Sequence, residues 1–127
     1  MAKDMLVCIG DGDDIGDAIE LYLLSGDLDS ASKFSFQVKA SIEKIAIDVQ
    51  VEMAASLIYV AGDDICFVAS TNNYISERLQ TYSNIFFENT GKTISFGVAK
   101  TSGEAAMCLR RAKVSGKGCI VIAGVKI

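Results

Sequence analysis

The stretch that most restricts the fold spans residues 56–70 and reads Ser-Leu-Ile-Tyr-Val-Ala-Gly-Asp-Asp-Ile-Cys-Phe-Val-Ala-Ser. It contains two β-rich runs, Ser56–Ala61 and Ile65–Ser70, separated only by Gly-Asp-Asp at 62–64. So short a connection allows an antiparallel hairpin and excludes the crossover that joins parallel strands. The sequence therefore disfavours a doubly wound parallel sheet.

Segments with helical periodicity flank this hairpin on both sides. The predicted helices are residues 15–23, 30–53, 75–90 and 101–115, and the other predicted strands are 5–10, 92–99 and 119–123. The expected order is β-α-α-β-β-α-β-α-β, which indicates an α+β fold with a mostly antiparallel sheet and helices on one face. A length of 127 residues favours a single domain, residues 1–127.

The composition excludes several kinds of site. The chain has no histidine, which removes a Ser-His-Asp triad, a Cys-His protease and any histidine-ligated metal. Its four cysteines form no CxxC pair and lie in apolar runs, so we expect buried, reduced thiols. Carboxylates, lysines and oxygen-bound cations remain as candidate chemistry.

The charges are unevenly distributed along the chain. The net charge of −4 argues against binding to a nucleic-acid polymer. Residues 1–30 hold eight acids and one base, whereas residues 100–127 hold six bases and one acid. This split suits a metal site facing a phosphate site, although ordinary solvated faces would look the same.

Two aspartate clusters fall at the ends of apolar strands. Asp11 follows the first strand, and Asp63 and Asp64 occupy the hairpin tip. In a sheet that pairs these strands the carboxylates converge, and their repulsion favours a bound cation such as Mg²⁺. Each cluster taken alone is also typical of a turn or a helix N-cap.

Glycines and basic residues supply a candidate phosphate site. Gly10, Gly12 and Gly16 surround the first aspartates, an arrangement expected to leave amides exposed at a helix N-terminus. Lys113, near the end of the last helix, and Lys117, in the turn after it, are the best candidates for phosphate contacts. A favourable interaction with the helix dipole is the alternative explanation for these lysines.

Taken in order, these segments resemble a known family. Ile9-Gly10-Asp11-Gly12-Asp13-Asp14-Ile15-Gly16, the hairpin, Ile94–Ala99 and Ala112–Lys117 are similar to GGDEF nucleotidyl cyclases and to the palm domain of the type III CRISPR large subunit. A short chain carrying them most resembles the minimal CRISPR polymerase (mCpol) family. The resemblance implies a ferredoxin-like palm fold and synthesis of cyclic oligonucleotides, with anti-phage defence as the setting.

The resemblance also implies roles for individual residues. Asp63 and Asp64 would be catalytic, and the metal ligands would be Asp11, the Gly12 carbonyl, Asp63 and Asp64. The implied cofactor is Mg²⁺ or Mn²⁺, two ions per site. The nucleotide-binding residues would be Gly12, Asp13, Asp14, Ile15, Gly16, Lys113 and Lys117.

Departures from the family pattern refine the expected substrate. The positions that match the guanine-selecting residues of diguanylate cyclases are Ile19 and Leu28, which cannot make those hydrogen bonds, so ATP is favoured. Ala61 and Ile65 replace the first glycine and the phenylalanine of GGDEF, and residues 53–60 contain no arginine for a product-inhibition motif.

One triphosphate site per chain implies a homodimer, at least during catalysis, if the product is a cyclic dinucleotide. The chain shows no signal-peptide layout and no apolar run long enough to cross a bilayer, so we expect a cytoplasmic protein without a membrane partner. The alternative function is a non-catalytic sensor of nucleotides or cyclic nucleotides.

Overall fold

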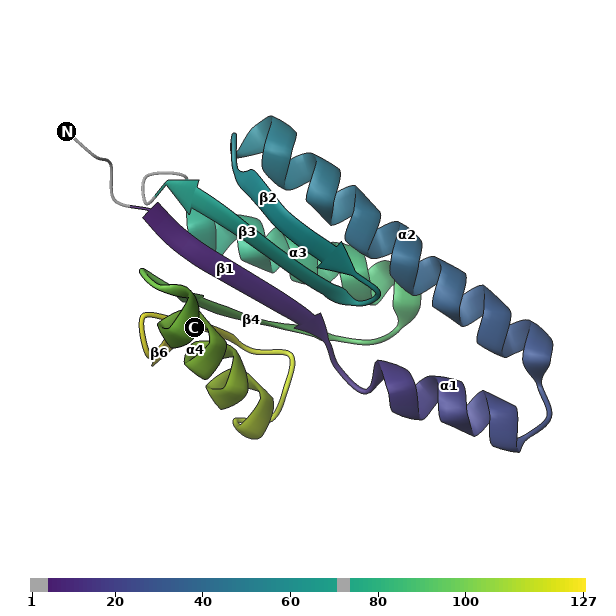
Figure 1. The fold of residues 1–127 in the computed structure, drawn as a ribbon. Coiled ribbons are helices and arrows are strands. Elements are labelled where there is room, and N and C mark those ends of the chain that lie inside the picture. The colour runs from purple at the N-terminus through teal and green to yellow at the C-terminus, as the bar shows by residue number, and fades with distance from the viewer. Residues whose placement is uncertain (1–4, 71–73) are drawn as a thin grey trace.

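The computed structural model describes residues 5–70 and 74–127, and Figure 1 shows how their helices and strands are arranged. The elements are β1 (Met5–Gly12), α1 (Ile15–Leu24), α2 (Leu28–Glu52), β2 (Ser56–Ala61), β3 (Asp64–Ser70), α3 (Ile75–Thr90), β4 (Ile94–Ala99), α4 (Ser102–Val114), β5 (Ile120–Ile122) and β6 (Val125–Lys126). The predicted order is confirmed, with β6 added, because a two-residue strand leaves no periodicity in a sequence. Over the described residues, no helix has the length and apolar character needed to cross a membrane.

The strands form one sheet in the order β2-β3-β1-β4-β5-β6. All neighbouring pairs are antiparallel except β4 and β5, which run parallel. The predicted α+β, ferredoxin-like architecture with a mostly antiparallel sheet is therefore correct. The topology places β1 at the centre, between β3 and β4, so both aspartate-bearing strands are neighbours.

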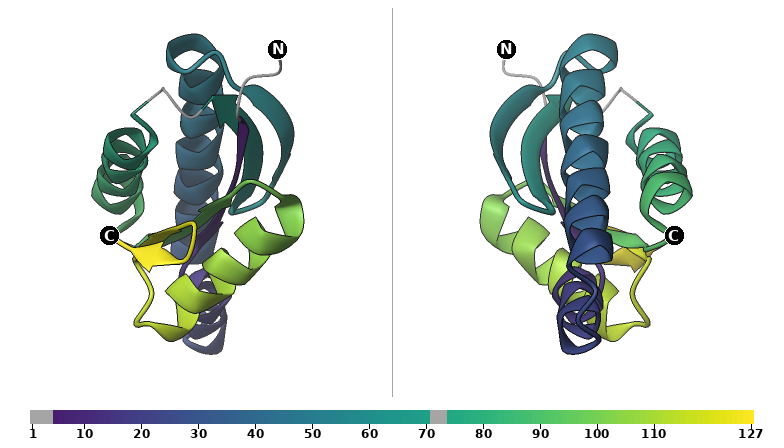
Figure 2. Two further views of the ribbon diagram at one scale, coloured as in Figure 1. Left: turned by 90° about the vertical axis from the view of Figure 1, so that its left-hand side faces the viewer. Right: turned by 90° about the vertical axis from the view of Figure 1, so that its right-hand side faces the viewer.

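Helices cover both faces of the sheet, which corrects the expectation that they share one face. Figure 2 shows α2 and α3 on one side and α4 on the other. The strand β1 serves both layers, because Leu6 and Cys8 enter the larger core, whereas Val7 and Ile9 pack against residues of α4. Because both faces of β1 are covered, its apolar run is unbroken, whereas a strand with one solvated face would alternate apolar and polar residues.

The first strand is longer than predicted, and this places an aspartate inside the sheet. We expected β1 to end at Gly10, but it continues to Gly12. Asp11 lies directly opposite Asp64 in the antiparallel register with β3 and opposite Ser95 on β4. The side chain of Asp11 therefore points to the same face as Val7 and Ile9, which is the face covered by α4.

Helix α4 packs unusually close to the sheet because β4 contains a glycine. A Cβ atom at Gly97 would lie 2.2 Å from the Leu109 backbone nitrogen and 2.3 Å from the Ala105 carbonyl oxygen. The start of α4 is set by Thr101, whose hydroxyl accepts a hydrogen bond from the Glu104 amide at 3.2 Å. These two features determine where the far end of α4, with its lysine, meets β1.

All four cysteines are buried, as their apolar surroundings predicted. Burial, with a smaller contribution from Cys66, raises the pKa of the Cys8 thiol to about 12. A thiol with so high a pKa is a poor nucleophile at neutral pH. Cys8 is therefore part of the packing and not a candidate for the chemistry.

Candidate active site

Three carboxylates converge at one end of the central strands, as predicted from the strand order. Asp11 and Asp64 face each other across β1 and β3, and Asp63 lies in the turn that precedes β3. One oxygen of each carboxylate lies within 4.8 Å of the others, and all three residues are half-buried. We call Asp11, Asp63 and Asp64 the carboxylate triad.

The electrostatics of the triad favour a bound cation. Burial, followed by the hydrogen bond and charge of Asp11 and the charge of Asp63, raises the pKa of Asp64 to about 7. Burial and the charge of Asp11 likewise raise the pKa of Asp63. Three hard oxygen donors at this spacing fit Mg²⁺ or Mn²⁺, whose charge would relieve their repulsion.

The raised pKa of Asp64 predicts how the stability of the metal-free protein depends on pH. The folded state keeps this proton up to about pH 7, whereas the unfolded chain releases it near its ordinary value of 3.8. The folded state thus binds more protons between these values, and the free energy of unfolding falls as pH rises through this range. We expect the melting temperature in EDTA to fall as the pH rises from about 5 to about 8. Addition of Mg²⁺ should raise the melting temperature more at pH 8 than at pH 5.

The matched control for this experiment is Asp64→Asn, which removes the titrating group without changing the size of the side chain. Its melting temperature should vary less with pH than that of the wild type. A wild-type profile that is flat or rises over this range would contradict the expectation.

Lys113 lies next to the triad rather than on an open surface. Its Nζ is 2.9 Å from Asp11 Oδ2 and 2.7 Å from Asp13 Oδ1. It also donates to the backbone oxygens of Asp11 and Gly12, both at 3.0 Å, so the carbonyl predicted as a metal ligand is here a partner of Lys113. Burial alone would lower the pKa of Lys113, but the bonds to Asp13 and Asp11 raise it, and the side chain remains a cation.

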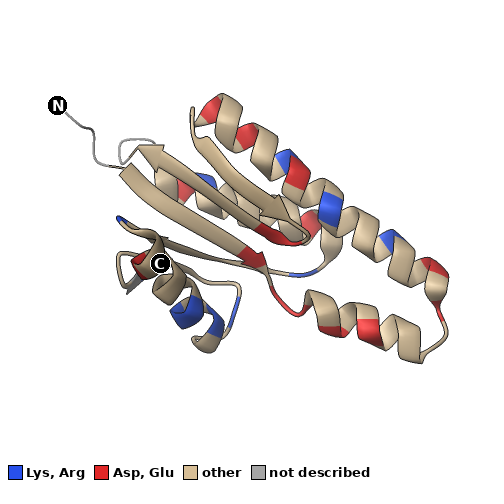
Figure 3. Cartoon of the chain, viewed as in Figure 1, with Lys and Arg blue, Asp and Glu red and all other residues tan. Residues whose placement is uncertain are grey.

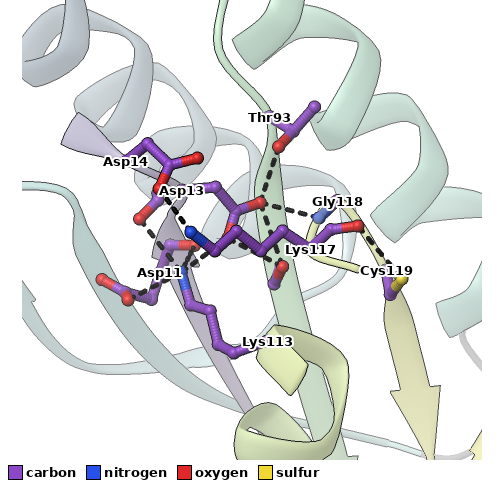
Figure 4. A network of polar contacts seen from close by, with 10 residues as sticks. Asp11, Asp13, Asp14, Thr93, Lys113, Lys117, Gly118 and Cys119 are labelled. Atoms are coloured by element: carbon purple, nitrogen blue, oxygen red, sulfur yellow. Dashed lines mark hydrogen bonds and ion pairs between the residues drawn. The ribbon is translucent and has the colours of Figure 1, made fainter. Parts of the chain in front are cut away.

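Asp13 was predicted to contact the nucleotide, but its carboxylate faces inward. Figure 4 shows it at the centre of a polar network that joins β1, β4 and the end of α4. It is 2% exposed, and it accepts hydrogen bonds from the hydroxyls of Thr93 and Ser95 and from the Gly118 amide. Burial would raise the pKa of Asp13, but the hydrogen bonds from Lys113, Thr93 and Gly118 lower it.

Asp14 and Lys117 form an ion pair at the surface beside this network. Asp14 occupies the N-cap position of α1 in a left-handed conformation, with φ of 58°, and its side chain makes no cap hydrogen bond. Lys117 is also left-handed, with φ of 62°. The expected N-cap role of an aspartate is therefore not observed, and the pair instead connects the start of α1 to the turn after α4.

Fewer backbone amides are free around Asp11 than the sequence predicted. The Gly12 amide donates to the Asp63 carbonyl at 3.1 Å, and the Asp13 amide donates to the Thr93 carbonyl at 2.9 Å. Gly10 and Gly12 lie within β1 and not in a loop. The amides without intrahelical partners are those of the first turn of α1, which contains Ile15 and Gly16.

A cavity of about 850 Å³ adjoins the triad, and the sequence did not reveal it. Its lining residues include Ile15, Gly16, Ile19, Lys39, Glu43 and Asp63. It is formed between α1, α2 and the β2–β3 hairpin. Because these segments are distant in the sequence, no local pattern predicts the cavity. Asp63 thus belongs both to the triad and to the wall of this cavity.

The distribution of charge agrees with this geometry. Figure 3 shows acidic segments at the end of β1, at the β2–β3 turn and along α1, with basic segments at the end of α4 and in the turn that follows it. The acidic first quarter and the basic last quarter of the sequence meet through Lys113 and Lys117. Asp11, Asp13 and Asp14 thus share one site with these two lysines.

Several solved protein structures have a fold similar to that of this chain. The apo Csm1–Csm4 cassette has a TM-score of 0.68 at 23% identity over 93% of this chain and 20% of the matched chain. The same cassette with one ATP has a TM-score of 0.66 at 21% identity over 96% of this chain and 20% of the matched chain. A diguanylate cyclase/phosphodiesterase from Caldicellulosiruptor saccharolyticus has a TM-score of 0.66 at 13% identity over 100% of this chain and 82% of that one.

These structural similarities show the shared fold, and the chain spans about a fifth of the length of the Csm1–Csm4 chains that it matches. Among curated protein sequences, none matches the chain significantly. The model of one family, the minimal CRISPR polymerase domain, matches residues 7–123. That range contains the triad, both lysines and the whole Asp13 network, and on this match the chain belongs to the minimal CRISPR polymerase (mCpol) family.

Proposed function

We propose that the chain is a nucleotidyltransferase that uses Mg²⁺ or Mn²⁺ to join nucleoside triphosphates, ATP in preference, into a cyclic oligonucleotide, with a cyclic dinucleotide as the favoured product. The whole of residues 1–127 acts as one palm domain. The observation that carries the proposal is the carboxylate triad, which lies beside Lys113 and adjoins a cavity of about 850 Å³. A role in anti-phage defence is part of the proposal and is suggested by the CRISPR-related family.

Each part of the site has a place in this function. The triad provides oxygen ligands for two divalent ions, and the chemistry that such ions supply is activation of a hydroxyl nucleophile and stabilisation of the leaving pyrophosphate. Lys113 and Lys117 bind the triphosphate, together with the amides at the start of α1. Lys117 first exchanges Asp14 for a phosphate, and the exposure of both side chains keeps the cost of this exchange small.

The reaction forms one phosphodiester bond at each transfer. A ribose hydroxyl oxygen of one nucleotide bonds to the α-phosphorus of another, the bond from that phosphorus to the β-phosphate breaks, and pyrophosphate leaves. A carboxylate beside the reacting hydroxyl can accept its proton, and Asp64, as a member of the triad, is placed for this role. Ring closure repeats the same transfer between the two ends of the linear intermediate.

The residue at position 19, which matches a guanine-selecting position of diguanylate cyclases, supports adenine as the favoured base. Ile19 lines the cavity, and an apolar side chain offers no partner to the guanine edge. Leu28, the other position that matches a guanine-selecting residue, is 69% exposed at the start of α2 and is not among the residues that line the cavity. Solved Csm1–Csm4 cassettes are described as complexes with ATP and with cA4, which is consistent with an adenine nucleotide for a chain of the same fold.

A cyclic dinucleotide requires two triphosphates that face each other, whereas each chain has one triad among its described residues. A homodimer, permanent or formed during catalysis, would bring two such sites together. The turnover per chain should then rise with protein concentration before it levels off.

The experiment that tests the proposed function is incubation of the protein with ATP, GTP or both, in the presence of Mg²⁺ or Mn²⁺, followed by mass spectrometry. We expect pyrophosphate and a cyclic product that contains adenine. Binding of nucleotide without a divalent ion and without release of pyrophosphate would instead indicate a sensor. If no combination of triphosphates is turned over, the catalytic proposal is wrong.

A further inference from the structure

The buried carboxylate of Asp13 has all its acceptor positions in use. Oδ1 accepts from Lys113 Nζ at 2.7 Å and from the Ser95 hydroxyl at 3.0 Å. Oδ2 accepts from the Thr93 hydroxyl and the Gly118 amide, both at 2.7 Å. A carboxylate offers about four such positions. Asp13 therefore acts on the site through Lys113 and not by binding a metal ion or a phosphate itself.

Lys113 lies between two carboxylates that differ in what else they can bind. Asp11 is a member of the triad and its side chain is 33% exposed, whereas the Asp13 side chain is 1% exposed. Both carboxylates lie within 3 Å of the same ammonium group. A divalent ion on the triad would compete with the ammonium for Asp11 and repel it, but would leave the contact with Asp13 in place.

Asp13 is also held too firmly to follow Lys113 if the lysine moves. Its three other partners come from β4, from the residue before β4 and from the turn after α4. The Asp13 amide is fixed as well, by the Thr93 carbonyl. A buried charge with this many partners is costly to expose or unpair, so the position of the Asp13 carboxylate is a fixed reference for the ammonium group.

We propose that Asp13 is a positioning residue that keeps the Lys113 ammonium in place when a divalent ion displaces it from Asp11, so that the Asp11 carboxylate can bind the ion while the positive charge stays beside it for the triphosphate. This role rests on the proposed function, because it concerns the metal and triphosphate of that site. It separates the acidic residues of the first strand and loop into a metal ligand, Asp11, and an internal counter-ion, Asp13. Without Asp13, Lys113 has Asp11 as its remaining anionic partner among the contacts described.

The test is the affinity for Mn²⁺, measured by electron paramagnetic resonance without nucleotide, so that it does not depend on turnover. Asp13→Asn keeps an oxygen for the Gly118 amide but removes the charge that attracts Lys113. We expect Mn²⁺ to bind about tenfold more weakly, the scale found when partners of metal ligands are removed. Asp17→Asn removes one exposed acidic charge on α1 that does not contact Lys113 and should change the affinity less than twofold.

A double-mutant cycle shows whether the effect passes through Lys113. Lys113→Met removes the competing cation and should bind Mn²⁺ at least as tightly as the wild type. Asp13→Asn in the Lys113→Met background should then cost less than about twofold. An equal loss in both backgrounds, or no loss in Asp13→Asn alone, would overturn the proposal, as would a wild type that binds no Mn²⁺.

A crystal structure of the wild-type protein with Mn²⁺ tests the proposal even if Asp13→Asn fails to fold. We expect Lys113 Nζ to remain within hydrogen-bond distance of Asp13 Oδ1 and to move away from Asp11 Oδ2. An ammonium that leaves Asp13 when the metal binds would overturn the positioning role. Failure of the proposed function looks different, because Mn²⁺ would bind with these same contacts while no triphosphate was turned over.

Discussion

Replacing Asp63 by alanine is expected to lower triphosphate turnover by about 10³-fold or more, the scale seen when one group that stabilises a transition state is removed. Asp63 belongs to the triad and also lines the adjoining cavity, so in the proposed function its loss would remove a metal ligand where the nucleotide and the metal are expected to meet. The measurement is the rate of pyrophosphate release at saturating ATP and Mg²⁺.

The stability of Asp63→Ala should change in the opposite direction from its activity. The charge of Asp63 contributes to the raised pKa of Asp64, so its removal relieves repulsion, and the metal-free variant should melt no lower than the wild type. The contact from the Gly12 amide uses the Asp63 backbone oxygen and survives the substitution. Glu88→Ala, an exposed carboxylate on α3, is the control and should keep full activity. Turnover by Asp63→Ala within tenfold of the wild type would contradict the assignment.

Replacing Gly97 by alanine is expected to destabilise the protein by about 3 kcal/mol, the upper part of the range for overpacked cores. The new Cβ would lie 2.2 Å and 2.3 Å from backbone atoms of α4. Backbone atoms cannot rotate aside as a side chain can, so α4 must move away from the sheet. The melting temperature should fall by roughly 10 °C, as measured by calorimetry.

Activity should fall with stability in Gly97→Ala, because α4 carries Lys113 and a displaced helix moves its ammonium away from Asp11 and Asp13. Gly103→Ala is the matched control on the same helix, since a Cβ there has no neighbour within 4 Å. It should leave activity unchanged and stabilise the helix by roughly 0.5–1 kcal/mol. A Gly97→Ala protein that melts within 2 °C of the wild type would show that α4 does not pack against the sheet as described.

Part of the site followed from local patterns alone. The Gly-Asp-Asp between two β-rich runs predicted a hairpin, and a strand that pairs with it predicted the meeting of Asp11 with Asp63 and Asp64, which the register confirms. The helical periodicity predicted helices over residues 75–90 and 101–115, where the structure has α3 (Ile75–Thr90) and α4 (Ser102–Val114). These predictions succeed because helical periodicity, turns and strand alternation depend on residues that are near in sequence.

Other predictions failed where a distant contact determines the outcome. The glycines around Asp11 suggested a loop with open amides, but pairing with β3 and β4 extends β1 through Gly12. Asp13 and Asp14 are adjacent and equally acidic in the sequence, yet one is buried and the other is half-exposed and paired with Lys117. The extra strand β6 is too short for any pattern to indicate it.

The sequence by itself determined that this protein is a histidine-free α+β domain with its acids concentrated in the first quarter and its bases in the last. The tertiary structure decided which acids form the carboxylate triad and which one is buried against Lys113. That choice depends on the side of the sheet on which α4 packs, and so on a contact between residues 100 positions apart. The free energy of a buried ion pair depends on its surroundings, and these are assembled only when the chain folds.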